Sequence, residues 1–529
     1  MRPLKMKFRS TAWWQRLAAL PFVRHFTLPL GLAIMVLALS VLSNGFDLSV
    51  YNSIQAMDAF DRRFGKCNAK GVCALDTFHL AMLNSFPLIA YAVGLLIATL
   101  IGERFGRRTV FVAMNVVCLI GIITSYTAQS FVQIFVGRLL VNAYVGMESW
   151  LVPLFQAEIV PAKVRGAVVS CYLLGRLLGS FLISCVGYKT AHWAGDTSWR
   201  TPLAVLFSIP PVCLCLTFLI PESPRWLVRV GKDEKALQNL RYLHDGDGVD
   251  VEMELVLLKE SLTLDTEGGG WLDLFRGSNT GRTAIAMITN FFGQATGQSF
   301  VNNYGTIFFK TLGVNPFLVT MFSTLAALVG AALFLVLVDR VGRRRFWQTS
   351  APLCALIMLV IGGLGVKQDP SANQKLAIAT LFPIWGIFYL SSFAQLAALT
   401  PAEIPSLSLR EKTAMMGWSV QNLTNFVSTF TVPYLINAGH GNLHAKVGFV
   451  YGAIGMVGVI WAFFYYPELK GRSLEEIDEM LRQKIPARKT AEWRMARDGI
   501  AFKLAEISQE TNADPEEKGG GILVENTAV

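Results

Sequence analysis

Four charged residues interrupt long apolar stretches of the chain, namely Asp47, Arg138, Glu148 and Arg176. A charge at the centre of a membrane-spanning helix costs about 2.5–3.5 kcal/mol on insertion scales, so such residues face a cavity and find partners. A carboxylate there can bind a proton, and an approaching arginine favours its ionised form, so protonation can follow a conformational change. The alternative is a permanent structural ion pair. These residues predict proton or solute binding inside a membrane.

A second set of charges forms a signature that occurs twice, at 103–108 (ERFGRR) and at 339–344 (DRVGRR). A glutamate and an arginine seven residues apart also occur twice, at 158–165 and 403–410. We expect these charges to pair across two halves of the protein when the cytoplasmic side is shut; solvated loop charges that set topology are the alternative. The predicted cytoplasmic gate consists of Glu103, Arg104, Arg107, Arg108, Glu158, Arg165, Asp339, Arg343, Arg344, Glu403 and Arg410.

The composition places the chain in the membrane class. It has 529 residues, of which 53% are hydrophobic and only 16% charged, whereas soluble domains average about 25% charged residues. The formal net charge of +10 could suggest a nucleic-acid partner. Lys and Arg, however, gather in short segments beside apolar runs, as the positive-inside rule requires, and we expect no nucleic acid.

Apolar runs of roughly 20 residues, the length that crosses a bilayer, predict an all-α membrane protein with twelve transmembrane helices in two six-helix bundles. The predicted spans are 28–51, 79–101, 109–128, 131–155, 166–187 and 202–220, followed by 283–309, 317–338, 346–366, 377–400, 412–436 and 446–466.

The spans divide the chain into five parts. We expect a cytoplasmic N-terminal segment 1–27, a bundle 28–220, a cytoplasmic linker with short helices 221–282, a second bundle 283–466 and a cytoplasmic tail 467–529. The polar length of the linker could not cross hydrocarbon. The even helix count places both termini in the cytosol. The first helix is too long for a signal-peptide core and should be retained.

Eight cysteines are present, and two of them differ from the rest. Cys67 and Cys73 lie in the polar loop after the first span, on the predicted extracellular side, where a disulfide or two free thiols are possible. The other cysteines lie in apolar helices and are expected to act as small core residues. The spacing of Cys and His matches no metal site, and we find no catalytic motif, so we expect no metal, no cofactor and no enzyme.

Several motifs together resemble the sugar porters of the major facilitator superfamily, over residues 26–477. They include Gly45-Phe46-Asp47, the two signatures above, Gly137-Arg138, the segments 158–166 and 403–410, 221–227 (PESPRWL) and 467–477 (PELKGRSLEEI). The sequence of residues 403–413 is most similar to that of the fungal sugar porters. The resemblance implies two bundles with a central solute site and alternating access. In proton-coupled members, the acid at Asp47 binds the proton and the arginine at Arg138 controls its affinity.

The substrate positions of that family match only in part. Leu173 replaces a sugar-binding Gln, Ala398 replaces a tryptophan that packs on the sugar, and Leu206 replaces an acid found in some symporters. Arg176 stands where an apolar residue is usual, and its fork of donors suits a carboxylate or phosphate; neutralisation by Glu148 or Asp47 is the alternative. The predicted substrate-binding residues are Arg176, Gln294, Gln298, Asn302, Asn303, Gln421, Asn422 and Asn425.

The sequence therefore predicts a secondary transporter of a sugar or sugar-like solute, driven by proton symport with alternating access. One alternative is an exporter or importer of a non-sugar metabolite or organic acid on the same fold. Another is a nutrient sensor that does not transport. The expected partners are a small-molecule substrate, protons and the lipid bilayer, and the expected location is the plasma membrane, as a multi-pass monomer.

Overall fold

The computed structural model describes residues 27–67, 73–244, 251–264, 270–367, 370–406, 409–437 and 441–493. We call residues up to 220 the N-half and residues from 278 to 466 the C-half. The N-half contains α2 (Leu28–Ile54), α4 (Thr77–Phe105), α5 (Arg107–Tyr126), α6 (Phe131–Ile159), α7 (Ala162–Thr190), α8 (Thr197–Leu206) and α9 (Ile209–Leu216). The C-half contains α13 (Ser278–Ala295), α14 (Gln298–Leu312), α15 (Pro316–Val341), α16 (Arg343–Leu364), α17 (Ala372–Tyr389), α18 (Gln395–Glu403), α19 (Arg410–Ile436) and α20 (Val447–Tyr465).

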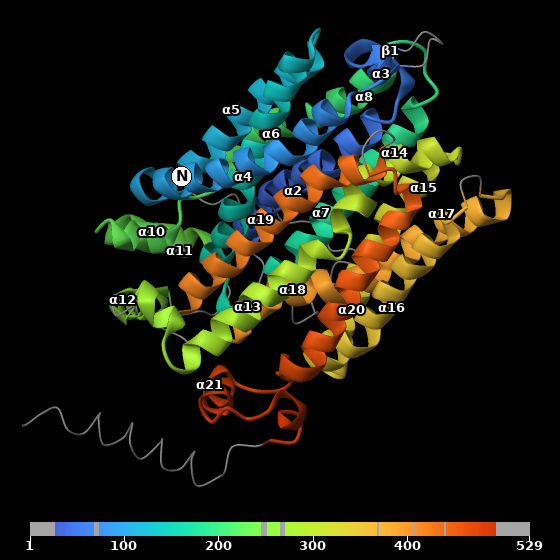
Figure 1. The fold of residues 1–529 in the computed structure, drawn as a ribbon. Coiled ribbons are helices and arrows are strands. Elements are labelled where there is room, and N and C mark those ends of the chain that lie inside the picture. Colours follow the sequence, from blue (N-terminus) through green and yellow to red (C-terminus); the bar gives the residue numbers. More distant parts are fainter. Residues whose placement is uncertain are drawn as a thin grey trace, which may run out of the picture.

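The remaining elements lie at the two ends of the helix bundle (Figure 1). One end carries α3 (Asp58–Phe64) and a two-stranded antiparallel sheet of β1 (Lys66–Cys67) and β2 (Cys73–Ala74). A disulfide between Cys67 and Cys73 joins the two strands, so we call this end the disulfide side. The other end carries α10 (Pro224–Arg229), α11 (Asp233–His244), α12 (Val251–Leu264) and α21 (Leu474–Arg482); we call it the linker side. Short 3-10 turns lie at Thr217–Leu219, Trp271–Phe275, His444–Lys446 and Ala487–Lys489.

The predicted fold class is confirmed: the chain is an all-α membrane protein whose twelve predicted spans are all helical. Nine helical segments in the described parts of the chain are long and apolar enough to cross a membrane. The spans formed by α6, by α13 with α14, and by α19 fall outside that group. The helix α14 has only 15 residues, and α6, α13 and α19 carry polar residues along their length. These are the helices that hold most of the predicted site. Residues 1–26 and 494–529, in the predicted terminal segments, lie outside the described residues.

The two halves repeat the same helix pairing, which explains the repeated sequence signature. In the N-half, α2 packs against α7 and α4 against α6; in the C-half, α13 packs against α19 and α15 against α17. The halves meet where α4 contacts α19 and α7 contacts α15, which are equivalent pairs with the halves exchanged. Such internal repeats enclose a solute site near the middle of the membrane in many transporters.

Two predicted spans of the C-half are not regular helices at their centres. The run 283–309 divides into α13 and α14 at Thr296 and Gly297, and Gly297 has a φ of 103°, in the left-handed region that glycine tolerates. The run 377–400 contains a π-helical turn, Leu390–Ala394, between α17 and α18. Interrupted helices leave backbone groups and polar side chains available at the level where a solute would bind.

The contact between α2 and α7 is unusually close at Gly45. A Cβ atom added to Gly45 would lie 2.1 Å from the backbone oxygen of Arg176 and 2.9 Å from the Cα atom of Gly179. Only glycine allows this approach. The contact places the polar residues of α2 on either side of Gly45, Asn44 and Asp47, next to α7.

We predict that Gly45→Ala destabilises the protein by about 1–3 kcal/mol, because the two helix backbones must separate to admit the methyl group. Gly31→Ala in the same helix is the matched control, since a Cβ there meets nothing within 4 Å. Thermal unfolding of the purified protein in detergent, followed by intrinsic fluorescence, measures both. Equal stability of the two variants would contradict the close packing at Gly45.

Candidate functional site

A cluster of charges closes the linker-side end of the N-half. Arg107, at the start of α5, binds Glu158 of α6 through two contacts, Nη2 to Oε1 at 2.8 Å and Nε to Oε2 at 2.9 Å. The backbone N–H of Arg107 donates to Oε1 of Glu222 at 2.8 Å. Bidentate contacts between arginine and carboxylate are strong and fix geometry as well as charge. The cluster thus ties α5, α6 and the start of the linker together.

The C-half carries the same cluster at the equivalent place. Arg343 binds Glu403 at 2.8 Å and 3.2 Å and also Asp339 at 2.9 Å, and its backbone N–H donates to Glu468 at 2.9 Å. Gly342 is the turn residue here, with a φ of 102°, as Gly106 is in the N-half with a φ of 94°. A Cβ on either glycine would collide with the carboxylate of Glu468 or Glu222.

The pairing predicted from the sequence, between charges of opposite halves when this side is shut, stays a prediction. Among the described residues, the predicted gate residues form ion pairs only within their own half. In this arrangement the guanidinium groups of Arg107 and Arg343 bind carboxylates of their own half. The backbone N–H groups of the same two residues donate to Glu222 and Glu468, which the prediction missed. The signal was present, because Pro-Glu follows both the sixth and the twelfth span at 221–222 and 467–468.

The other predicted gate residues have weaker roles in this arrangement. Arg344 donates to the backbone oxygens of Tyr466 and Phe463, and the backbone oxygen of Glu103 accepts from the Trp226 indole. Arg104 lies over the ring of Phe105, and the backbone N–H of Arg108 donates to Glu222. Arg165 is exposed. The Nε and Nη2 atoms of Arg410 are buried without a partner.

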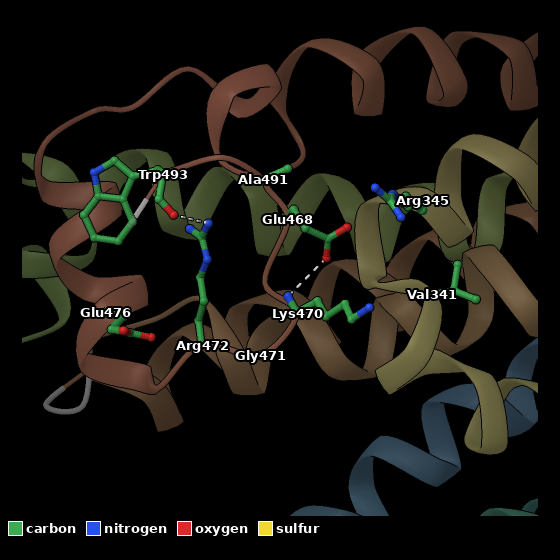
Figure 2. A pocket seen from close by; sticks show the side chains of 9 residues that line it. All are labelled: Val341, Arg345, Glu468, Lys470, Gly471, Arg472, Glu476, Ala491 and Trp493. Carbon is green, nitrogen blue, oxygen red and sulfur yellow. Dashed lines mark hydrogen bonds between the residues drawn. The ribbon is translucent and has the colours of Figure 1, made fainter. Parts of the chain in front are cut away.

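A cavity of about 370 Å³ lies beside the C-half cluster, on the linker side (Figure 2). Its lining includes Arg345, Lys470 and Arg472, together with Glu468 and Trp493. Arg472 is held by the backbone oxygen of Trp493 at 2.8 Å, and the backbone N–H of Lys470 donates to Glu468 at 3.1 Å. The cavity is thus bounded by the start of α16 and the segment that follows α20, beyond the membrane-spanning part of the C-half.

Inside the N-half, Asp47 and Arg138 are both buried but do not form an ion pair with each other. Asp47 Oδ2 accepts from the Asn142 amide at 3.3 Å, and Asp47 Oδ1 has no partner. Arg138 donates through Nε to the backbone oxygen of Leu83 at 2.8 Å, and its guanidinium lies 3.8 Å from the ring centre of Tyr51. The structure brings the two residues near each other yet leaves the carboxylate without a direct cation.

Glu148 of α6 forms a second polar centre, next to Asn44, which lies about one helix turn before Asp47 on α2. Its side chain is fully buried, and Oε2 accepts hydrogen bonds from the Asn44 amide and from the Tyr172 hydroxyl, the latter at 2.8 Å. Arg176 interacts electrostatically with both Glu148 and Asp47. The sequence had singled out Glu148 and Arg176 as embedded charges, but Asn44 and Tyr172 were missed because amides and tyrosines are common in helices.

The polar residues of the C-half form a network between α14 and α19. Asn425 Oδ1 accepts from the hydroxyls of Ser299 at 3.2 Å and Thr429 at 3.1 Å, and the Asn303 amide donates to Thr429 at 3.3 Å. Gln298, in the same turn as Ser299, accepts from it at 3.4 Å. Ser299 and Thr429 were not predicted, since their role depends on the facing helix.

The remaining predicted substrate residues lie around this network. Gln294 lies at the end of α13, beside the break, with a buried Oε1 that has no partner. Asn302 exposes its side chain, and its backbone oxygen accepts from Asn52 of α2 at 2.6 Å. Gln421 and Asn422 are half-buried on α19. The helix break thus gathers the predicted amides on α13, α14 and α19, whereas Arg176 stands on α7 in the other half.

Contacts between the halves close the disulfide side. Lys310 of α14 binds Asp61 at 2.7 Å and Asp58 at 2.8 Å, both on α3. The Asn437 amide donates to the Thr77 hydroxyl at 3.0 Å. Next to α3, Cys67 and Cys73 form a disulfide that joins β1 to β2. The predicted gate residues make no such bridge on the linker side of the described chain, so the molecule is closed towards the disulfide side.

Comparison with known proteins gives a consistent result. A family model described as "Sugar (and other) transporter" matches residues 32–481. The major facilitator-type transporter ecdD of Aspergillus rugulosus is 28% identical over 469 residues, which cover 85% of this chain and 86% of the relative. The general alpha-glucoside permease of Saccharomyces cerevisiae is 26% identical over 477 residues, which cover 86% of this chain and 76% of the relative.

Among solved structures, the xylose transporter XylE from E. coli in an inward open conformation superimposes with a TM-score of 0.70. The sequences are 22% identical, and the match covers 84% of this chain and 98% of that chain. The likeness supports the fold described above.

We predict that acidification favours the closed disulfide side. Burial raises the pKa of Asp61 in this closed arrangement, although Lys310 opposes the shift. An Asp61 that separates from α14 and becomes exposed would return to an ordinary aspartate pKa of about 3.9. The closed arrangement therefore binds this proton more tightly, and its advantage grows as the pH falls through the raised pKa and levels off below about 4.

Spin labels at the exposed positions Arg63 and Thr311, with exposed Cys171 and Cys215 replaced by Ser, report the distance between α3 and α14 by pulsed electron resonance. The short-distance population should rise as the pH falls towards 4, and Asp61→Asn should remove most of that response. A short-distance population that falls with acidification would contradict the prediction.

Proposed function

The chain belongs to the sugar transporter family of the major facilitator superfamily, and we propose that it carries a sugar or sugar-like solute together with protons, by alternating access. A match to a transporter family makes the chain a multi-pass membrane protein rather than an enzyme. The two names reported above, a permease for alpha-glucosides and a xylose transporter, describe those proteins, and they support a sugar-like solute for this one.

The observation that carries the proton part of the proposal is the state of Asp47. Its carboxylate is buried, its Oδ1 atom has no partner, and the nearby Arg138 is engaged by Leu83 and Tyr51. An unpaired carboxylate in a low-dielectric site favours protonation, whereas movement of Arg138 towards it would favour release of the proton. Proton binding at Asp47 can therefore alternate with the position of Arg138.

The solute part of the proposal rests on the C-half network. A polyol presents donors and acceptors around its whole ring, and each one buried without a partner costs about 1–3 kcal/mol. The amides near the break in α13 and α14, with Asn425 and the hydroxyls of Ser299 and Thr429, offer both kinds of group at one level of the bundle. This arrangement suits a neutral hydroxylated solute.

The remaining parts of the proposal concern orientation and movement. Basic residues gather on the linker side, so we place the linker and both termini in the cytoplasm and the disulfide in the extracellular space of the plasma membrane. Because Lys310 closes the disulfide side, the proposed solute site between the two halves would open towards the cytoplasm. The two linker-side clusters would then act as fixed ends of each half, around which the halves rock.

We predict that Asp47→Asn abolishes accumulation of solute against its gradient but preserves exchange of labelled for unlabelled solute. One pH unit supports up to about tenfold accumulation per proton carried, and a neutral amide cannot carry that proton. The measurement is uptake of labelled D-glucose, maltose and D-xylose into proteoliposomes with and without an imposed pH gradient.

Asp196→Asn is the control for this prediction, because Asp196 is half-exposed and pairs only loosely with Arg200, at 3.5 Å. If Asp47→Asn still accumulates solute when the pH gradient is imposed, proton coupling at Asp47 is wrong. If the wild type binds a sugar but neither accumulates nor exchanges it, the chain is a sensor rather than a transporter.

A second candidate is transport of a hydroxylated organic acid, favoured by one observation. Arg176 Nε is buried without a partner and could donate to a substrate carboxylate. Under this alternative, Arg176→Ile should weaken transport of D-galacturonate by about ten- to a hundredfold, the value of a charge-assisted hydrogen bond, and should spare D-glucose. The matched control is Arg63→Gln on the exposed face of α3. Equal loss of both solutes would assign Arg176 a role other than recognition of the acid.

A further inference from the structure

Glu148 is a buried acid for which the proposed function has no use. It is 0% exposed, and its two hydrogen-bond donors, the Asn44 amide and the Tyr172 hydroxyl, are both neutral. Its second oxygen, Oε1, has no partner, and Glu148 forms no ion pair within the described residues. A buried carboxylate without a cation is costly unless it takes up a proton or a cation moves to it.

The nearest available cation is Arg176. It lies one turn after Tyr172 on α7, interacts with both Glu148 and Asp47, and forms no ion pair with either in the described structure. Its Nε atom is buried and unpartnered. The close approach of Gly45 to the Arg176 backbone oxygen holds the backbone of Arg176 against α2, the helix that carries Asn44 and Asp47.

The two guanidinium groups of this centre are not equivalent. Arg138 donates through Nε to the backbone oxygen of Leu83 and lies over the ring of Tyr51, while its Nη1 atom is buried without a partner. Arg138 acts on Asp47, whereas Arg176 acts on both Asp47 and Glu148. Neither acid has a direct cation here, so the arrangement favours states in which one acid holds a proton and the other holds Arg176.

We propose that Glu148 is a second proton-binding carboxylate, and that Arg176 is a counter-ion shared between Asp47 and Glu148. The inference rests on the proposed function only for its link to transport. Protonation of either acid releases Arg176 to the other, so the two sites do not titrate independently. When one carboxylate takes a proton from water, the Arg176 guanidinium moves to the other carboxylate and lowers its proton affinity.

The other titratable groups around Glu148 remain compatible with this role. Tyr144 faces it from its own helix, Tyr172 and Arg176 face it from α7, and Cys213 faces it from α9. Tyrosine and cysteine in apolar surroundings stay neutral near pH 7. Arg176 is therefore the one group among these that can change the charge balance of Glu148 by moving.

Infrared difference spectroscopy of the full-length protein in lipid, titrated with protons alone and without solute, tests the proposal. The wild type should show two buried carboxyl C=O bands that disappear as the pH rises. Glu148→Gln should lose one band and Asp47→Asn the other, and Glu148→Asp should restore the missing band. In each single variant, the pH at which the remaining band disappears should shift by about one unit or more, because Arg176 is no longer shared.

Glu234→Gln on the exposed face of α11 is the matched control and should leave both bands unchanged. Tyr172→Phe keeps the carboxyl and removes one donor, so it should shift the C=O frequency of the Glu148 band and leave the C=O frequency of the Asp47 band unchanged. This variant serves if Glu148→Gln does not fold. The proposal is overturned if Glu148→Gln and Tyr172→Phe leave both bands as in the wild type. It is also overturned if the Asp47 band disappears at the same pH in Glu148→Gln as in the wild type. Because no solute is present, these outcomes are independent of whether the protein transports sugars.

Discussion

A charged side chain inside a bilayer must have a partner or give up its charge, and this constraint determines the centre of the molecule. Asp47 and Glu148 meet the constraint only in part, since neutral amides and a tyrosine bind them and no cation contacts them directly. Arg138 and Arg176 stand close by without pairing. Partly satisfied charges are costly at rest, and for the same reason they respond strongly when a proton or a solute arrives.

The linker side follows the opposite rule. There, the Arg107 guanidinium binds Glu158, and the Arg343 guanidinium binds Glu403 and Asp339. A glycine turn lets a further carboxylate, Glu222 or Glu468, reach the backbone N–H of the same arginine. Fully satisfied networks are rigid. Each half is thus stiff at its linker-side end and polar with unfilled bonding capacity at its centre. Two stiff bodies that meet along equivalent helix pairs can rock against each other, whereas a change of charge at the centre can select between their arrangements.

The sequence was sufficient to predict the architecture, because twelve apolar runs predict twelve membrane spans and a repeated signature predicts two equivalent halves. It also singled out Asp47, Arg138, Glu148 and Arg176, since charges in apolar helices are conspicuous. It was not sufficient for pairing. Which carboxylate binds Arg107, or whether Ser299 faces Asn425, depends on how separate helices are rotated against each other, and no periodicity within one helix records that. The breaks at Gly297 and at the π-helical turn were missed because their apolar runs read as continuous.

The central claim is that solute movement and proton binding at the Asp47 centre are one coupled event. The most direct measurement reverses the usual direction of coupling. Proteoliposomes are loaded with D-glucose or maltose, diluted into solute-free buffer without a starting pH gradient, and followed with a luminal pH dye. The account predicts that solute leaving the vesicles carries protons out and makes the lumen alkaline. Rapid solute efflux with an unchanged luminal pH would contradict it.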